Sequence, residues 1–170
     1  MRKLSILVVG AFFLLGFTTI ANAQDNIGGH IGFVVPWVTH AGGQTTSEFD
    51  NFSIGFPIGV TFKGTGHMNV DLEMIPTFSQ NPHTVTLTVD PGVVFSVPHD
   101  IGLGLRAAFD VNSSTIGFIP LVNKTWKFKE PKGIFKAYFV EADFPVKFSR
   151  PTGGPATNPV TFATHFGLGF

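Results

Sequence analysis

The chain has no cysteine, only one tyrosine and few charged residues, which make up 13% of its 170 positions. The absence of cysteine excludes disulfide scaffolds, cysteine-ligated metal centres and thiol nucleophiles. The 11 basic and 11 acidic residues balance, so we expect no nucleic-acid partner. Phenylalanine and glycine are abundant, with 20 of each, and 44% of the chain is hydrophobic. This composition excludes a disordered chain and favours a strand-rich protein that faces lipid.

The N-terminal residues have the pattern of a secretory signal. Arg2 and Lys3 precede an uncharged apolar run, Leu4–Phe17, and the small residues of Ala21-Asn22-Ala23 follow it. A retained membrane anchor is the alternative, but the run is shorter than the roughly 20 residues that a spanning helix needs. We therefore expect residues 1–23 to be removed and residues 24–170 to form one domain.

Alternation of apolar and polar or small residues dominates the rest of the chain and predicts β-strands. Eight segments are expected, at residues 27–37, 52–62, 68–74, 84–97, 101–110, 115–128, 140–148 and 160–170. The sixth is irregular, and its two faces stay unassigned. Asp90-Pro91-Gly92 is open to two interpretations, a hairpin turn or an interruption within one strand. We favour one strand, because two five-residue pieces would be too short to span a membrane.

The number and length of these segments predict an all-β protein, a closed antiparallel eight-stranded up-and-down transmembrane β-barrel. Closure is expected because lipid cannot hydrogen-bond the open edge of a sheet. The alternative is a soluble barrel that buries its apolar face and carries a ligand. The second face of the strands argues against it, because that face holds mostly glycine, serine, threonine and alanine rather than large polar residues.

The C-terminal segment ends in an aromatic residue with apolar residues two, four and eight positions before it. These residues are Phe162, Phe166, Leu168 and Phe170. The segment resembles the terminal strand signal of small eight-stranded bacterial outer-membrane β-barrel proteins. The resemblance implies residence in the cell outer membrane, contact with its lipid, and recognition by the barrel assembly machinery. The chain departs from such proteins by using phenylalanine in place of most tyrosine and tryptophan, and by placing Thr164 within the apolar alternation.

The resemblance also implies that both termini lie in the periplasm. The expected outward loops are then residues 38–51, 79–83, 112–114 and 149–159. The expected periplasmic turns are residues 63–67, 98–100 and 129–133.

Polar and charged residues on the inward faces predict a network inside the barrel. Its expected members are His30, Asp71, Glu73, Asp90, Arg106, Asp110, Glu141, Asp143, Lys147 and His165. Buried charges are paired or shift their pKa values towards neutrality. We interpret the set as a satisfied network that fills and stiffens the barrel, with a proton or cation path as the alternative. Eight strands leave no room for an aqueous pore, so we expect no channel.

Signals for catalysis are weak. His40, Ser47 and Glu48 lie in the first outward loop, but their spacing does not force them together. The His-x-Ser motif that we associate with lipid A 3-O-deacylases is absent, because His165 is followed by Phe166-Gly167. No metal or cofactor motif occurs.

One basic cluster stands out, formed by Lys124, Lys127, Lys129, Lys132 and Lys136. Either it is a solvated turn or its ammonium groups meet phosphate head groups. The chain as a whole is expected to have a structural or binding role, exercised through its outward loops towards an extracellular ligand or surface partner. The alternatives are an outer-leaflet lipid hydrolase and a soluble periplasmic ligand carrier.

Overall fold

The structure is a computed structural model that describes residues 26–111, 113–149 and 156–170. The predicted signal of residues 1–23 lies outside these ranges, within which no helix is long and apolar enough to cross a membrane. All named strands belong to one sheet. They are β1 (Ile27–Ala41), β2 (Gln44–Ser47), β3 (Ser53–Gly55), β4 (Ile58–Lys63), β5 (Met68–Ser79), β6 (Thr84–Val97), β7 (Ile101–Asp110), β8 (Ile116–Lys132), β9 (Phe135–Asp143), β10 (Val146–Phe148) and β11 (Val160–Gly169).

Two of the strands that cross the ring, which we call spans, are each divided into two pieces at a proline. β3 and β4 are separated at Phe56-Pro57, and both pieces pair with β1 and β5 in a single register. β9 and β10 are separated at Phe144-Pro145 and keep a single register with β8 and β11. Proline has no N–H to donate to the ladder, so each gap falls at a residue that cannot make the full set of ladder hydrogen bonds. The strands therefore make eight spans, and β2 is an additional short strand that pairs with β1.

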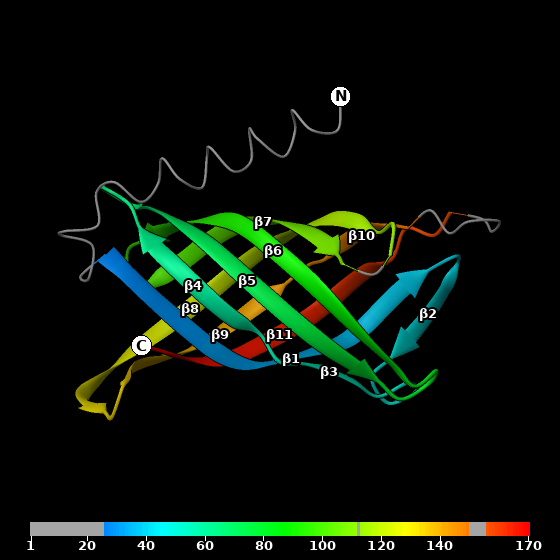
Figure 1. Cartoon of the computed structure of the whole chain (residues 1–170), viewed down its shortest axis with the longest axis horizontal. Helices are drawn as coiled ribbons and strands as arrows, with labels where there is room; N and C mark the ends of the chain where they lie inside the picture. Colours follow the sequence, from blue (N-terminus) through cyan, green and yellow to red (C-terminus); the bar gives the residue numbers. More distant parts are fainter. Residues whose placement is uncertain (1–25, 112, 150–155) are drawn as a thin grey trace, which may run out of the picture.

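These eight spans pair in chain order, and the last returns to the first. β5, β6, β7, β8 and β9 each pair with the next, β9 pairs with β11, and β11 pairs with β1 from His30 to His40. The backbone amides of Gly29 and Phe170 each donate to the other's carbonyl oxygen, over 3.1 and 2.9 Å. β1 also pairs with β4, which pairs with β5. The result is an antiparallel up-and-down ring of tilted strands (Figure 1).

The ambiguous fourth segment is one strand. β6 pairs with β5 without interruption through Pro91 and Gly92, so the prediction of a single strand is confirmed. The sixth segment, now β8, places Ile119 and Leu121 inward while Phe118 and Val122 are exposed. Apolar residues thus occupy both faces, which explains why its alternation could not be assigned.

Two predicted connections are wrong. The expected loop at residues 38–51 contains the end of β1 and all of β2, joined at Gly42 and Gly43, whose φ angles of 58° and 79° suit a two-residue hairpin. The expected turn at residues 129–133 is mostly strand, because β8 continues to Lys132 and β9 begins at Phe135, before the expected residue 140. In both places the strands continue through residues that lack the alternation of apolar and polar positions, so the pattern did not identify them as strand.

The two faces of the ring have opposite character. Large hydrophobic side chains are exposed on its outside, among them Phe33, Val60, Met74, Leu105 and Phe162. The hydrophobic side chains buried among the described residues are only Ala108, Ile119, Leu121 and Ala163. Ten polar or charged residues are buried, and most are acids, arginine and histidine. The core of this ring is therefore polar and its surface apolar, the reverse of a water-soluble protein.

Connections gather at two ends of the ring. One end carries the β1–β2 hairpin, the β5–β6 turn and the last residues of β7 and β10; the other carries the β4–β5, β6–β7 and β8–β9 turns together with the C-terminus. Figure 1 shows the β1–β2 and β8–β9 hairpins extending from opposite ends. We call these the β2 end and the β8–β9 end.

Candidate functional site

The centre of the interior is organised by Arg106 of β7. Its guanidinium group lies 2.8 Å from Asp71 Oδ2, 3.3 Å from Glu73 Oε2 and 2.7 Å from Glu141 Oε1. The side chains of all four residues are at most 4% exposed. Arginine presents five N–H donors in a planar fork, which suits it to hold several carboxylates at once.

Two histidines complete this cluster. His30 Nε2 lies 2.7 Å from Glu73 Oε1. His165 Nδ1 lies 3.5 Å from Glu141 Oε1 and 3.7 Å from Glu73 Oε1, and the two imidazole rings are 5.9 Å apart. We name His30, Asp71, Glu73, Arg106, Glu141 and His165 the arginine cluster. The structure therefore brings six of the sequence-predicted interior residues into one contact group.

Asp110 and Lys147 form a second, separate group. Lys147 Nζ lies 2.7 Å from Asp110 Oδ1 and 3.3 Å from Thr88 Oγ1, while the Thr88 hydroxyl donates to Asp110 over 2.7 Å. The Lys147 side chain is 25% exposed, so this lysine group is only partly buried.

Three uncharged side chains in these groups were not predicted. Thr61 donates to Asp71 Oδ1 over 2.7 Å, Asn123 donates to Glu141 Oε2 over 3.1 Å, and Thr88 joins the lysine group. Thr61 and Thr88 stand on faces that the alternation marks as inward, so the signal was present. Asn123 lies on β8, whose faces the sequence left unassigned.

Glycines on facing strands make room for the large interior side chains. A Cβ atom on Gly92 would lie 2.6 Å from Arg106 Cγ, and one on Gly59 would overlap the His30 ring. Real Cβ atoms do not approach other heavy atoms this closely. Gly59 is thus explained by the volume of the His30 ring, and Gly92 by the close approach of the β7 backbone at Leu105 and Arg106 together with the Arg106 side chain.

A cavity of about 900 Å³ reaches the arginine cluster from the β8–β9 end. Its lining includes His30, Asp71, Arg106 and Glu141 at the inner part, and Lys127, Lys136 and Phe170 nearer the end of the ring. The cavity gives water and small ions a route to the buried charges.

The catalytic candidates do not meet. His40 Nδ1 bonds with Thr45 Oγ1 over 2.9 Å, Ser47 Oγ donates to Asp50 Oδ2 over 2.7 Å, and Glu48 Oε1 accepts from the Ser53 amide over 2.7 Å. Among the described residues no hydrogen bond joins His40 to Ser47 or Glu48. The hydrolase interpretation therefore gains no support from these contacts.

The same contacts order the loop of residues 47–53, which leaves Phe49 at its tip 92% exposed. Burial raises the pKa of Glu48 above its usual 4.5, and the Ser53 amide opposes that rise. Hydrogen bonds from the Ser47 hydroxyl and amide lower the pKa of Asp50 below its usual 3.8. The Asp50 carboxylate is thus held in its charged form by the loop.

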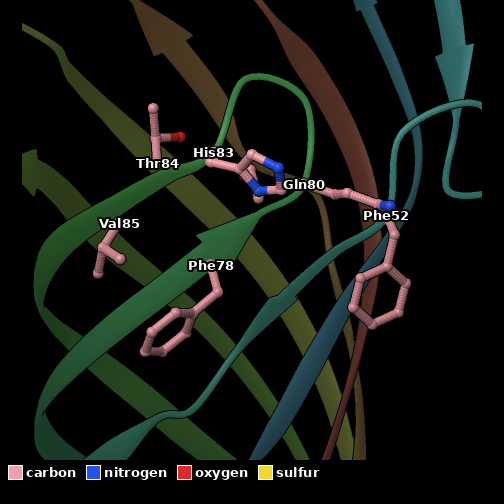
Figure 2. A pocket seen from close by; sticks show the side chains of 7 residues that line it. Phe52, Phe78, Gln80, His83, Thr84 and Val85 are labelled. Carbon is pink, nitrogen blue, oxygen red and sulfur yellow. The ribbon is translucent and has the colours of Figure 1, made fainter.

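A small apolar pocket of about 380 Å³ lies beside this loop, where the β5–β6 turn meets the segment before β3. Figure 2 shows the rings of Phe52 and Phe78 on its lower side, with His83 above them. The Gln80 amide donates to the Phe52 carbonyl oxygen over 2.9 Å and fixes the two segments together.

Aromatic residues lie outside the ring towards both ends. Trp37 is near the β2 end and donates from Nε1 to Thr164 Oγ1 over 2.7 Å, which gives a structural reason for threonine within the apolar alternation of β11. On the β8–β9 hairpin, Trp126 and Tyr138 stack with ring centroids 5.2 Å apart. Lys124 Nζ lies 5.7 Å from the centroid of Trp126. Of the basic cluster, Lys124 therefore lies beside the aromatic pair, while Lys127 and Lys136 line the interior cavity.

The expected assembly-signal residues lie along β11 and at its end. Phe166 stacks on Phe33 at 5.3 Å and Phe162 packs against Phe144 at 5.4 Å, while Leu168 pairs with Tyr138 across the β11–β9 ladder. Phe170 lies beyond β11, where its backbone bonds with Gly29. These contacts show how the residues pack, and recognition by assembly machinery stays a prediction.

Comparisons with known proteins place the chain in no family. No family model matches it, and no curated protein matches its sequence. A solved structure from work on the de novo design of transmembrane β-barrels is similar at a TM-score of 0.40 and 11% sequence identity, over 81% of this chain and 94% of the other.

Proposed function

We propose that the chain is a β-barrel protein of the cell outer membrane with a structural or binding role, exercised through the loops at its β2 end. The observation that carries this proposal is the inverted distribution of side chains, in which ionic groups fill the interior and phenylalanine, isoleucine, leucine and valine cover the outside. In water such a surface would aggregate, and in lipid it is the stable arrangement.

The dimensions of the strands support a crossing of the bilayer. β5 has 12 residues. At about 3.4 Å per residue such a strand is about 40 Å long, and a tilt of about 45° makes it span nearly 30 Å, close to the hydrocarbon thickness. Trp37 towards one end, and Trp126 with Tyr138 towards the other, suit the two interfacial belts that these residue types favour.

The interior supports a barrel that does not conduct. Arg106 and its three carboxylate partners occupy the middle of the ring with side chains at most 4% exposed. Eight strands enclose a space that such side chains fill. A planar bilayer that contains the purified protein should therefore show no stepwise current.

The β2 end supports a binding role. The loop of residues 47–53 is fixed by hydrogen bonds at Ser47, Glu48 and Asp50, yet it presents Phe49 almost fully exposed. A rigid loop with an aromatic tip loses little entropy when it binds, so Phe49 is suited to anchor a surface partner. A soluble carrier would have to bury its apolar surface, whereas the large apolar side chains of this ring are exposed on its outside.

The absence of cysteine allows a direct test of orientation and location. Phe49→Cys and Ile134→Cys place single thiols at opposite ends of the ring, at side chains 92% and 69% exposed. On intact cells a membrane-impermeant maleimide should label the first variant alone, and both after the outer membrane is permeabilised. Label at Ile134→Cys in intact cells would reverse the orientation, and release of the protein by osmotic shock would contradict the membrane assignment.

A further inference from the structure

The charges inside the ring do not balance. Its acidic side chains are Asp71, Glu73, Asp90, Asp110, Glu141 and Asp143, and its fixed cations are Arg106 and Lys147. Arg106 pairs with three of the acids and Lys147 with Asp110. No ion pair of the described residues includes Asp90 or Asp143, which are 0% and 6% exposed. Burial of an ionised carboxylate without a nearby cation costs free energy. A further positive charge inside the ring would therefore be stabilising.

One group has the composition and spacing of a metal site. Glu141 and Asp143 are two residues apart on β9 and both point inward, and His165 of β11 pairs directly with Glu141 across the ladder. One donor atom from each of Glu141, Asp143 and His165 lies within 4.8 Å of the other two. The β9–β11 register alone thus brings together two carboxylates and an imidazole.

A second observation shows unused binding capacity in this group. Asp143 Oδ1 is buried without a hydrogen-bond partner, and its residue is 6% exposed. Buried polar atoms in folded proteins are nearly always satisfied, so an unpartnered carboxylate oxygen beside two other donors points to a ligand. Glu141 accepts from Arg106 and Asn123 and still has acceptor capacity, because a carboxylate offers about four lone-pair sites.

We propose that Glu141, Asp143 and His165 bind a divalent transition-metal ion of the Zn²⁺ class inside the ring. Imidazole nitrogen together with carboxylate oxygen is a donor set that Zn²⁺ accepts, with three protein ligands and an open fourth position. The cavity at the β8–β9 end extends as far as Glu141 and gives the ion a route to that edge of the site. The proposal goes beyond the role of the loops and holds whichever partner they bind.

The test uses the full chain refolded in detergent and freed of metal with EDTA. Zn²⁺ is titrated in by calorimetry, and a parallel sample receives Zn²⁺ during refolding so that slow entry cannot hide binding. We expect one Zn²⁺ per chain, with Mg²⁺ at least tenfold weaker. Asp143→Asn and His165→Gln should each weaken Zn²⁺ binding at least tenfold, whereas Asp110→Asn, which changes a carboxylate of the lysine group, should leave it unchanged. The slower gel mobility of the heated sample confirms that each variant is folded before the titration.

Surface histidines provide the necessary control. His40, His67, His83 and His99 are exposed, and a variant with glutamine at all four should bind Zn²⁺ as the parent does. This variant keeps the test decisive even where Asp143→Asn or His165→Gln does not fold. Loss of binding in it, binding that is unchanged in Asp143→Asn and His165→Gln, or no uptake by the parent in either order of addition would overturn the proposal.

Discussion

The arginine cluster and the lysine group compensate the negative charge of interior carboxylates in different ways. The arginine cluster has one guanidinium group for three carboxylates and is almost fully buried. The lysine group has one ammonium for Asp110, with both side chains partly exposed, at 25% and 13%. The lysine group is partly open to solvent, whereas the charges of the arginine cluster are compensated mainly by one another. Loss of a charge should therefore be severe at Arg106 and mild at Lys147.

Arg106→Ala should have the largest effect. It leaves Asp71, Glu73 and Glu141 buried without their shared cation, so we expect a loss of about 3 to 5 kcal/mol in the free energy of unfolding. Urea titration in detergent micelles measures this loss, and gel mobility before and after heating shows whether the ring forms.

Arg106→Lys sharpens the same comparison, because it keeps the charge and removes the planar fork. One ammonium cannot reproduce the contacts with three carboxylates, so this variant should lie between Arg106→Ala and the parent. A stability equal to that of the parent would mean that charge alone, and not the fork, holds the cluster.

Gly92→Ala should have the next largest effect, because its Cβ would lie 2.5 Å from the Leu105 carbonyl oxygen and 2.6 Å from Cα and Cγ of Arg106. Overpacking of this kind costs about 1 to 3 kcal/mol. Gly169→Ala is the matched control, since a Cβ there meets its nearest neighbours only at 3.9 Å. Equal urea midpoints for the two variants would show that Leu105 and Arg106 shift enough to accept a methyl group at residue 92.

Lys147→Met should cost about 1 kcal/mol, because Asp110 keeps its hydrogen bond from Thr88 and is reached by water. The same urea titration applies. A loss as large as that of Arg106→Ala would remove the distinction between the two groups.

The smallest effect is expected outside the ring, at the loop of residues 47–53. The pKa of Asp50 is lowered, so its hydrogen bonds stabilise the loop above pH 3.8 and are lost as the pH falls through the value of the folded state. The pKa of Glu48 is raised, so its protonated carboxyl group stabilises the loop below pH 4.5. This stabilisation is lost as the pH rises through the pKa of Glu48 in the folded state.

Carbon-13 shifts of the two carboxyl groups should therefore show Glu48 titrating above 4.5 and Asp50 below 3.8. In Ser47→Ala the pKa of Asp50 should return towards 3.8, while the titration of Glu48 stays where it was. Titration of both groups at their usual values would show that the loop is not ordered in solution.

Much of the ring could be predicted because strands with an apolar outer face and a polar inner face alternate strictly. β5 places Met68, Val70, Leu72 and Met74 outward and buries Asp71 and Glu73, as the sequence pattern requires. The pattern failed where strands lack an apolar face. β2 and the outer part of β8 contain polar residues on both faces, and nothing in their alternation distinguishes them from loops.

The contacts of the site were harder to foresee than its members. Alternation identifies the inward residues, but register decides which of them meet, and register depends on turn lengths that were partly wrong. Arg106 joins acids from β5 and β9, which are distant in sequence, and Asp110 is left to Lys147. Asp143 was predicted as a member of the network, yet its proximity to Glu141 and His165 follows only from the pairing of β9 with β11.

The pairing of β1 with β11 has a consequence for how the chain folds. Residues 30 and 169 face each other in this ladder, so the seam joins parts of the chain that are nearly as far apart as its length allows. Such a contact order makes folding slow, because the entropy lost on closing so long a loop precedes any gain from the seam. Until that seam forms, both edges of an apolar-faced sheet are unpaired and prone to aggregation.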